Sequence, residues 1–189
     1  MASYHFVTVW RLQAPIERVW DELQHPERWP AWWKGFREVR ELEAGAEDGV
    51  GAVKRFGVRG ALPYTLFFDG RIVRVDAPRS LELDASGELE GTGRWSLEQQ
   101  GDITEARYTW DVRTSKPWMN ALAPVARPFF AWNHDVVMKD GGQRLARLLG
   151  VPLVDMELSA SPLRSTLKWA GAAIVSVLLL RRRALNRKA

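Results

Sequence analysis

The sequence predicts an α+β fold, in which a curved antiparallel sheet of about six or seven strands wraps around a long C-terminal helix. Three observations predict it. Short runs of alternating polar and apolar residues, divided by turn-forming residues, fill the middle of the chain. After Pro117 the apolar period lengthens to that of a helix. Proline-marked helical segments follow the first strand-like run, so two short helices are expected there.

The opening of the chain predicts one strand and the two short helices. Residues 4–12 alternate loosely and are rich in aromatic and β-branched side chains, as in a strand. Residues 15–23 begin with Pro15, whose fixed φ suits a first helical turn, and carry apolar residues at helical spacing. Pro26 and Pro30 then start a second short helical turn that is rich in tryptophan.

The middle of the chain predicts six further strands, and their ranges are 36–42, 51–58, 64–75, 81–86, 91–99 and 103–113. In the last of them Tyr108 and Trp110 share one face, whereas Arg107 and Asp111 share the other. This alternation is typical of a sheet with one buried and one solvated face. We therefore expect charged side chains of the outer face, such as Arg94 and Arg113, to form solvated cross-strand pairs.

Residues 129–149 predict the long helix, which we expect to start at Pro128 and to end at Gly150. The adjacent glycines 141 and 142 indicate a kinked or closely packed helix. A strongly curved sheet and a helix cannot fill all the volume between them. A cavity lined by Trp, Phe, Tyr, Leu and Met side chains is the expected result.

Composition and charge exclude several function classes. The chain of 189 residues contains no cysteine and only three histidines, so we expect no metal and no cofactor. From Arg164 onward there are seven basic residues and no acidic one, which leaves the rest of the chain mildly acidic. Binding of nucleic acid is therefore not expected, because it needs a clustered basic surface. The N-terminus lacks a secretory signal, and we expect a cytoplasmic protein.

Several local phrases resemble the helix-grip superfamily, also labelled SRPBCC, which includes START lipid-transfer domains and polyketide cyclase/dehydrase-like proteins. The phrases are residues 14–20, 26–33, 62–64, 91–95, 108–112, 116–120 and 132–138. The last two look like the polyketide cyclase-like branch. The resemblance covers about residues 4–150, and it implies a helix-grip domain, which we place over 1–152. The remainder, 153–189, is not part of the resemblance, and we expect a linker and a tail helix there.

Two functions are consistent with this resemblance, because the superfamily includes binding proteins, transfer proteins and enzymes. The first is binding, including transport, of an apolar small molecule or lipid in the internal cavity. The alternative is a polyketide cyclase/dehydratase-like enzyme acting on a poly-ketone or aromatic substrate. We favour the binding protein, because no sequence motif for catalysis is present. The expected ligand-binding residues are Phe68, Trp95, Tyr108, Trp110, Trp118, Phe130, His134 and Met138.

His134 is the candidate catalytic residue, since it lies on the predicted long helix and histidine titrates near neutral pH. Two alternatives remain open for it: a polar anchor for a ligand oxygen, and a packed histidine bonded to a strand backbone. The neighbouring Asp135 is not expected to orient it, because adjacent residues of a helix do not face each other. For the aromatic residues named above, two alternatives likewise remain open: they line a ligand-binding site, or they belong only to the hydrophobic core.

The tail contains an uncharged apolar stretch over residues 169–180 followed by three arginines. Three placements fit this pattern: a short or shallow anchor at the inner membrane face, a helix buried against a partner chain, and a tail folded onto the domain. The basic end favours the first, because arginines next to anionic headgroups are stabilised. The expected membrane-contacting residues are Trp169, Leu178, Leu179, Leu180, Arg181, Arg182 and Arg183.

Overall fold

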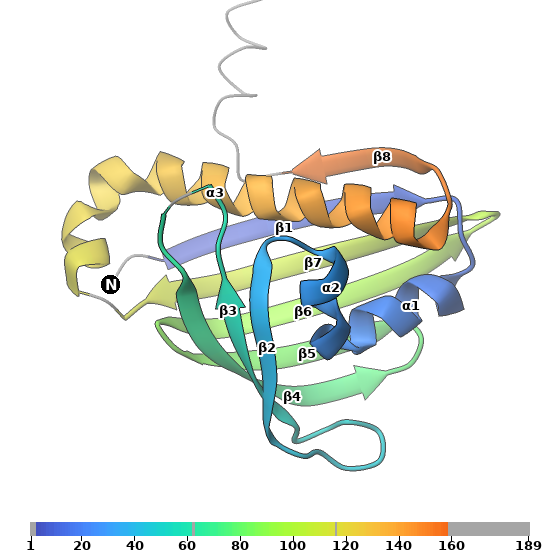
Figure 1. The fold of residues 1–189 in the computed structure, drawn as a ribbon, viewed down its shortest axis with the longest axis horizontal. Helices are drawn as coiled ribbons and strands as arrows, with labels where there is room; N and C mark the ends of the chain where they lie inside the picture. Colours follow the sequence, from blue (N-terminus) through green and yellow to red (C-terminus); the bar gives the residue numbers. More distant parts are fainter. Residues whose placement is uncertain (1–2, 62, 116, 159–189) are drawn as a thin grey trace, which may run out of the picture.

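The computed structural model describes residues 3–61, 63–115 and 117–158, with the backbone alone for residues 117–127. Figure 1 shows the long helix lying along the sheet, with the short helices at one end of it. The elements in chain order are β1 (Ser3–Leu12), α1 (Ile16–Gln24), the 3-10 helix η1 (Pro26–Arg28), α2 (Trp29–Trp32), β2 (Phe36–Glu43), β3 (Val53–Val58), β4 (Leu66–Asp76), β5 (Ser80–Gly87), β6 (Leu89–Gln100), β7 (Ile103–Thr114), α3 (Pro117–Leu149) and β8 (Leu153–Leu158).

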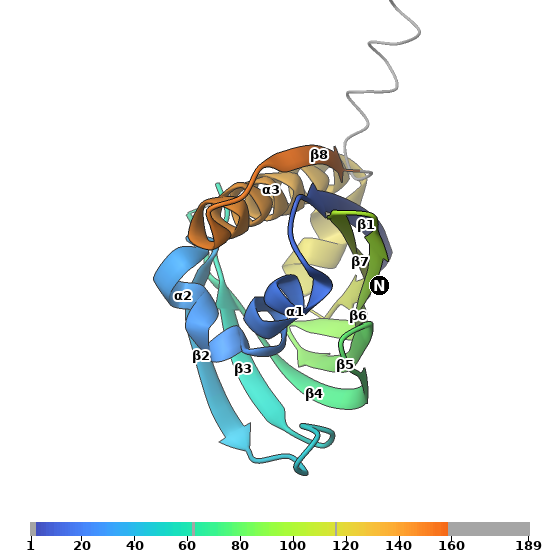
Figure 2. The ribbon, with the colours of Figure 1, turned by 90° about the vertical axis from the view of Figure 1, so that its right-hand side faces the viewer.

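The strands of the described residues form one antiparallel sheet in the order β2-β3-β4-β5-β6-β7-β1-β8. Figure 2 shows how the sheet curves from β1 and β7 through β4 to β2, with α3 across the open side. The predicted α+β class, with a curved sheet around a long C-terminal helix, is confirmed. In the described part of the chain the sheet has eight strands rather than six or seven.

The additional strand is β8, in a segment that the sequence analysis places in the linker. It pairs antiparallel with β1, where Thr8 lies opposite Leu158 and Trp10 opposite Met156. Its alternation is visible in the sequence, with Met156 and Leu158 half-buried and the acidic residues Asp155 and Glu157 exposed. The run is only six residues long and follows a proline, which made its pattern too short to separate from a linker.

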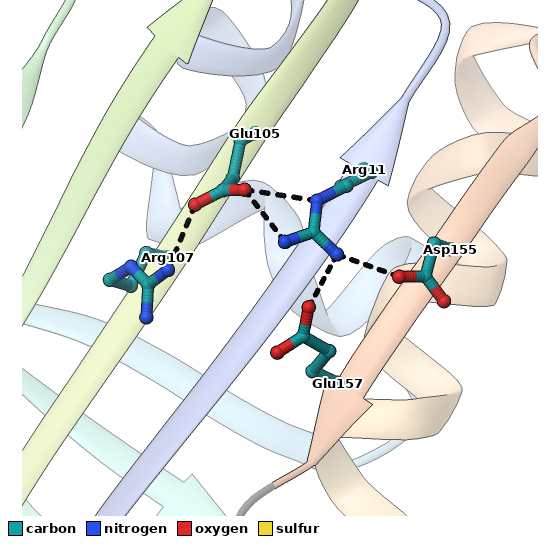
Figure 3. Close-up of polar contacts among 5 residues, drawn as sticks. All are labelled: Arg11, Glu105, Arg107, Asp155 and Glu157. Carbon is teal, nitrogen blue, oxygen red and sulfur yellow. Dashed lines mark hydrogen bonds and ion pairs between the residues drawn. The ribbon is translucent and has the colours of Figure 1, made fainter.

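Arg11 connects three neighbouring strands on the outer face of the sheet, as Figure 3 shows. On β1, its Nε donates to Glu105 of β7 at 2.9 Å, and its Nη1 donates to Asp155 and Glu157 of β8 at 2.6 Å each. Arg107 donates to the other oxygen of Glu105 at 2.9 Å. Burial alone would raise the pKa of Glu105, but the hydrogen bonds from Arg107 and Arg11 outweigh it and lower that pKa. The network therefore ties β8 to the rest of the sheet.

Replacing Arg11 by methionine is expected to lower the free energy of unfolding by about 1–2 kcal/mol, because three partly exposed carboxylates lose their shared cation. Hydrogen exchange should show the loss first at the amides of β8, which depend on Arg11 through Asp155 and Glu157. Arg40→Met is the matched control, since Arg40 makes one exposed ion pair at 3.9 Å, to Glu38. Unchanged protection of β8 in the Arg11 variant would contradict this role.

The long helix α3 begins at Pro117, earlier than the predicted start at Pro128. The prediction failed because it treated proline as a helix start, whereas the helix continues through positions 124 and 128. The C-terminal end is confirmed: α3 ends at Leu149, and Gly150 follows with φ +66°. The amides of residues 150 and 151 then bond back to the carbonyls of residues 147 and 146.

Trp10, Trp29 and Trp33 pack on one another next to α3 and form a tryptophan layer. Trp33 is 1% exposed, and its indole Nε1 donates to the carbonyl of Val137 on α3 at 2.8 Å. Trp10 packs edge-on against Trp33 with ring centroids 5.4 Å apart. Gly141 faces Trp33 at this contact, which places α3 unusually close to the tryptophan layer. Seven tryptophans of the described residues are buried, namely Trp10, Trp20, Trp29, Trp32, Trp33, Trp95 and Trp110.

Candidate binding cavity

A cavity of about 140 Å³, partly open to solvent at its rim, lies between α3 and the inner face of the sheet, on the N-terminal side of the tryptophan layer along α3. Alternation along β1 and β7 points every second side chain inward, and α3 contributes residues at three- and four-residue steps. The lining residues are Tyr4, Phe6, Phe36, Val58, Tyr64, Leu66, Phe68, Leu89, Tyr108, Trp110, Val112, Thr114, Phe130, Asn133, His134, Val137 and Met138.

The wall of this cavity is apolar and carries few polar groups. None of its lining residues in the described part of the chain is an aspartate, glutamate, lysine or arginine. Its polar side chains come from three tyrosines, one threonine, one asparagine and one histidine. The charged residues of β7, by contrast, are exposed on the opposite face, where Arg113 pairs with Glu90 at 3.0 Å. The alternation predicted for this strand therefore keeps its charged side chains out of the cavity wall.

The structure places six of the eight sequence-predicted binding residues around the cavity, and these are Phe68, Tyr108, Trp110, Phe130, His134 and Met138. Trp95 lies elsewhere, in the wall of a second hollow described below. The side chain of Trp118 lies outside the described residues. Lining a cavity does not by itself show ligand contact, so these residues remain predicted binding residues.

Eleven of the seventeen described lining residues were not among the predicted binding residues. Tyr4 and Phe6 could have been found, because they follow the same inward alternation on β1 as Trp10. Phe36 and Tyr64 could not, since each lies at or outside a strand end, where periodicity gives no direction. Tyr64 is 39% exposed, and its hydroxyl donates to Glu88 at 2.6 Å.

Gly93 makes room for the aromatic side chains of the neighbouring strand. It lies on β6 opposite Trp110 of β7. A Cβ atom at this position would lie 2.7 Å from the Trp110 ring and 2.7 Å from the Tyr108 hydroxyl. Because there is no side chain here, both rings can lie over the β6 backbone, and the space between the sheet and α3 stays open.

His134 is held in the cavity wall by stacking. Its ring stacks on Phe6 with centroids 4.3 Å apart and an interplanar angle of 19°. Neither Nδ1 nor Nε2 has a hydrogen-bond partner among the described residues. The Oδ1 atom of Asp135 lies 3.8 Å from Nδ1, which is too far for a hydrogen bond. Burial lowers the pKa of His134, and Asp135 opposes this only in part, so the ring is neutral at pH 7.

The stability of the protein is expected to depend on pH through His134. In the unfolded chain the pKa is about 6.5. The folded value is lower, so below that pH the unfolded state binds the extra proton and stability falls as pH decreases. His134→Phe should remove this component, whose slope is at most about 1.4 kcal/mol per pH unit. Urea unfolding of both proteins between pH 7.5 and pH 5 measures it, and parallel curves would show that the prediction is wrong.

Tyr108 supplies a second polar group. Burial raises its pKa far above the usual range, so its hydroxyl stays protonated at any physiological pH. The hydroxyl can therefore donate to a ligand oxygen or accept from a ligand donor. Its ring packs on Trp95 and Trp110, with centroids 4.6 and 5.9 Å apart.

A second hollow, of about 400 Å³, lies beneath the short helices and the β2–β3 loop. Its inner wall is apolar and includes Trp95 and Leu83, whereas its rim carries Glu41, Asp48 and other polar residues. The two spaces share three wall residues, and these are Phe36, Phe68 and Tyr108. The aromatic side chains of these residues therefore form the partition between them.

A curved antiparallel sheet that wraps a long C-terminal helix and encloses an apolar cavity defines the helix-grip class of proteins. The model of the family described as polyketide cyclase / dehydrase and lipid transport matches residues 4–150. The chain belongs to this family. The resemblance found in the sequence, which covers the same residues, is thereby confirmed.

Solved structures show the same fold at low sequence identity. TTHA0849 from Thermus thermophilus has a TM-score of 0.63 at 16% identity, over 77% of this chain and 99% of that one. The Zhui aromatase/cyclase from Streptomyces sp. R1128 has a TM-score of 0.60 at 20% identity, over 79% and 93%. A START superfamily protein from Mycobacterium smegmatis has a TM-score of 0.59 at 17% identity, over 77% and 99%. No curated protein matches the chain significantly.

The predicted membrane contact of the tail lies outside the described residues, which end at residue 158. Within the described part of the chain, no helix has both the length and the apolar character needed to cross a membrane. The placement of residues 169–183 therefore stays a prediction.

Proposed function

We propose that the protein binds an apolar small molecule in the cavity between α3 and the sheet. The observation that carries this proposal is the cavity wall itself, which is apolar and, among its described lining residues, has no Asp, Glu, Lys or Arg. Larger side chains could have filled the space, as the Trp33 indole does where it packs against α3. A hydrocarbon guest gains free energy when it leaves water for an apolar space of this kind.

The size of the cavity sets the size of the group that fits. Apolar cavities of about 150 Å³ bind benzene, and this one has a volume of about 140 Å³. One aromatic ring or a short branched chain would fill it. A longer molecule would have to displace the partition formed by Phe36, Phe68 and Tyr108 and extend into the second hollow.

Titration calorimetry of the full-length protein with bromobenzene tests the proposal. We expect saturable binding of one molecule per chain, with a Kd below about 1 mM, which corresponds to about −4 kcal/mol. The heat capacity change should be negative, because apolar surface is buried. If the measured heats equal the heats of dilution of bromobenzene, or if its binding does not saturate, the result would contradict a binding cavity.

A cyclase or dehydratase activity is the second candidate, favoured by one specific observation. His134 lies in the cavity wall with both nitrogens unpartnered among the described residues, and its low pKa keeps it available as a base. An enzyme would lose turnover of a poly-ketone substrate in His134→Phe. A binding protein would show no turnover in either form. The family description, which names both cyclases and lipid transport, is compatible with each.

Membrane association through the tail is a separate proposal, and the composition of the tail supports it. An uncharged apolar run followed by Arg181, Arg182 and Arg183 is favourable at an anionic leaflet. An anchored protein would exchange an apolar ligand with the bilayer over a short distance.

A further inference from the structure

We infer that the ligand is uncharged and that it presents a hydroxyl group to His134. This inference rests on the proposed function, since it names the chemical class of ligand that the same cavity takes. Three features of the wall carry it: its lack of charge, the unpartnered imidazole, and the fixed position of that imidazole.

The wall offers nothing to neutralise an ionised group. No lysine or arginine is among the described lining residues, so a bound carboxylate or phosphate would have no counter-ion. Asp135, whose carboxyl group lies 3.8 Å from the imidazole, provides no cation for an anionic ligand either. Burying an unpaired carboxylate costs several kcal/mol. A fatty acid or other anion is therefore disfavoured, although its hydrocarbon part would fit.

The imidazole has hydrogen-bonding capacity that the described structure does not use. A neutral histidine has one N–H donor and one acceptor nitrogen. Both nitrogens of His134 are buried, and neither has a partner among the described residues. An unpartnered buried polar group costs about 1–3 kcal/mol, which a ligand can recover by bonding to it. Stacking on Phe6 holds the plane of the ring.

A hydroxyl group matches this site better than a ketone or an aliphatic amine does. It donates to the acceptor nitrogen of His134, or accepts from the donor nitrogen, whichever tautomer is present. A ketone could only accept, and an aliphatic amine would be charged at neutral pH. The Tyr108 hydroxyl lies in the same wall and stays protonated, so it provides a second neutral partner.

Three probes of one size test the inference on the full-length protein at pH 7: 4-bromophenol, bromobenzene and 4-bromobenzoate. They share the ring and the bromine, and they differ only in carrying a hydroxyl, no polar group or a carboxylate. We expect 4-bromophenol to bind about tenfold more tightly than bromobenzene, and 4-bromobenzoate at least about 100-fold more weakly than 4-bromophenol. In His134→Phe, which keeps an aromatic ring on Phe6, the advantage of 4-bromophenol over bromobenzene should disappear.

The outcomes separate this inference from the proposed function. Equal affinities of 4-bromophenol and 4-bromobenzoate would overturn the inference while leaving a binding cavity in place. The same holds if His134→Phe keeps the full preference for the phenol. Binding of none of the three probes would overturn the proposed function itself. The comparison of the three probes on the unmodified protein needs no variant. It therefore tests the inference even if His134→Phe fails to fold.

Discussion

Gly141→Ala is expected to lower the free energy of unfolding by about 3 kcal/mol, at the upper end of the range for overpacked cores. Helix propensity alone predicts the opposite, a gain of about 1 kcal/mol. The structure reverses the sign because a Cβ at residue 141 would lie 2.3 Å from the Trp33 ring. That ring cannot retreat, since its Nε1 is bonded to Val137 and Trp10 packs against it.

Thermal unfolding measures this effect, and a fall in Tm of about 5–10 °C is the expected result. Gln143→Ala is the control, because residue 143 is exposed on the same turn of α3 and is likewise replaced by alanine. Its Tm should stay within about 2 °C of that of the unmodified protein. A Tm for Gly141→Ala equal to or above that of the unmodified protein would mean that α3 does not lie this close to Trp33.

Val112→Phe is expected to weaken ligand binding at least about tenfold while preserving the fold. Val112 lies on β7 and lines the cavity, where it is 6% exposed. A phenyl ring at this position would fill a space that holds about one ring, and filling an empty apolar space stabilises a protein by about 0.5–2 kcal/mol. Bromobenzene should therefore bind at least about tenfold more weakly, whereas Tm should be unchanged or higher.

Val73→Phe is the matched control, because Val73 is also a strand valine but is 38% exposed and does not line the cavity. Its affinity for bromobenzene should equal that of the unmodified protein, as measured by titration calorimetry. If Val112→Phe folds with an unchanged Tm and still binds bromobenzene normally, the ligand occupies another site. If its Tm falls sharply, the space beside Val112 is already filled.

The sequence predicted the layout of the fold well, because long alternating strands carry a strong signal. Residues 103–113 were predicted as a strand with Tyr108 and Trp110 inward, and β7 has this arrangement. Two elements were predicted wrongly, because the local sequence pattern was weak in β8 and misleading at the start of α3. The six residues of β8 depend on pairing with β1, and the prolines within α3 imitate a helix start.

The candidate site was less predictable than the fold. Alternation along a strand shows which side chains point inward, but it does not show which part of the interior they line. Trp95 faces inward as predicted, yet it lies at the second hollow, since the sheet curves between β6 and β4. Phe6 was not singled out, although its stacking under His134 fixes the imidazole. Contacts of this kind join residues more than a hundred positions apart, and periodicity within one element cannot reveal them.

The most direct test of a ligand cavity between α3 and the sheet is a crystal structure of the full-length protein with 4-bromophenol, using the anomalous signal of bromine. The account predicts one strong bromine peak inside the 140 Å³ cavity, with the phenol oxygen within hydrogen-bond distance of His134. Bromine bound only at the outer surface, for example beside the exposed Trp132, would contradict it. So would an interior without bromine at a concentration that saturates binding in solution.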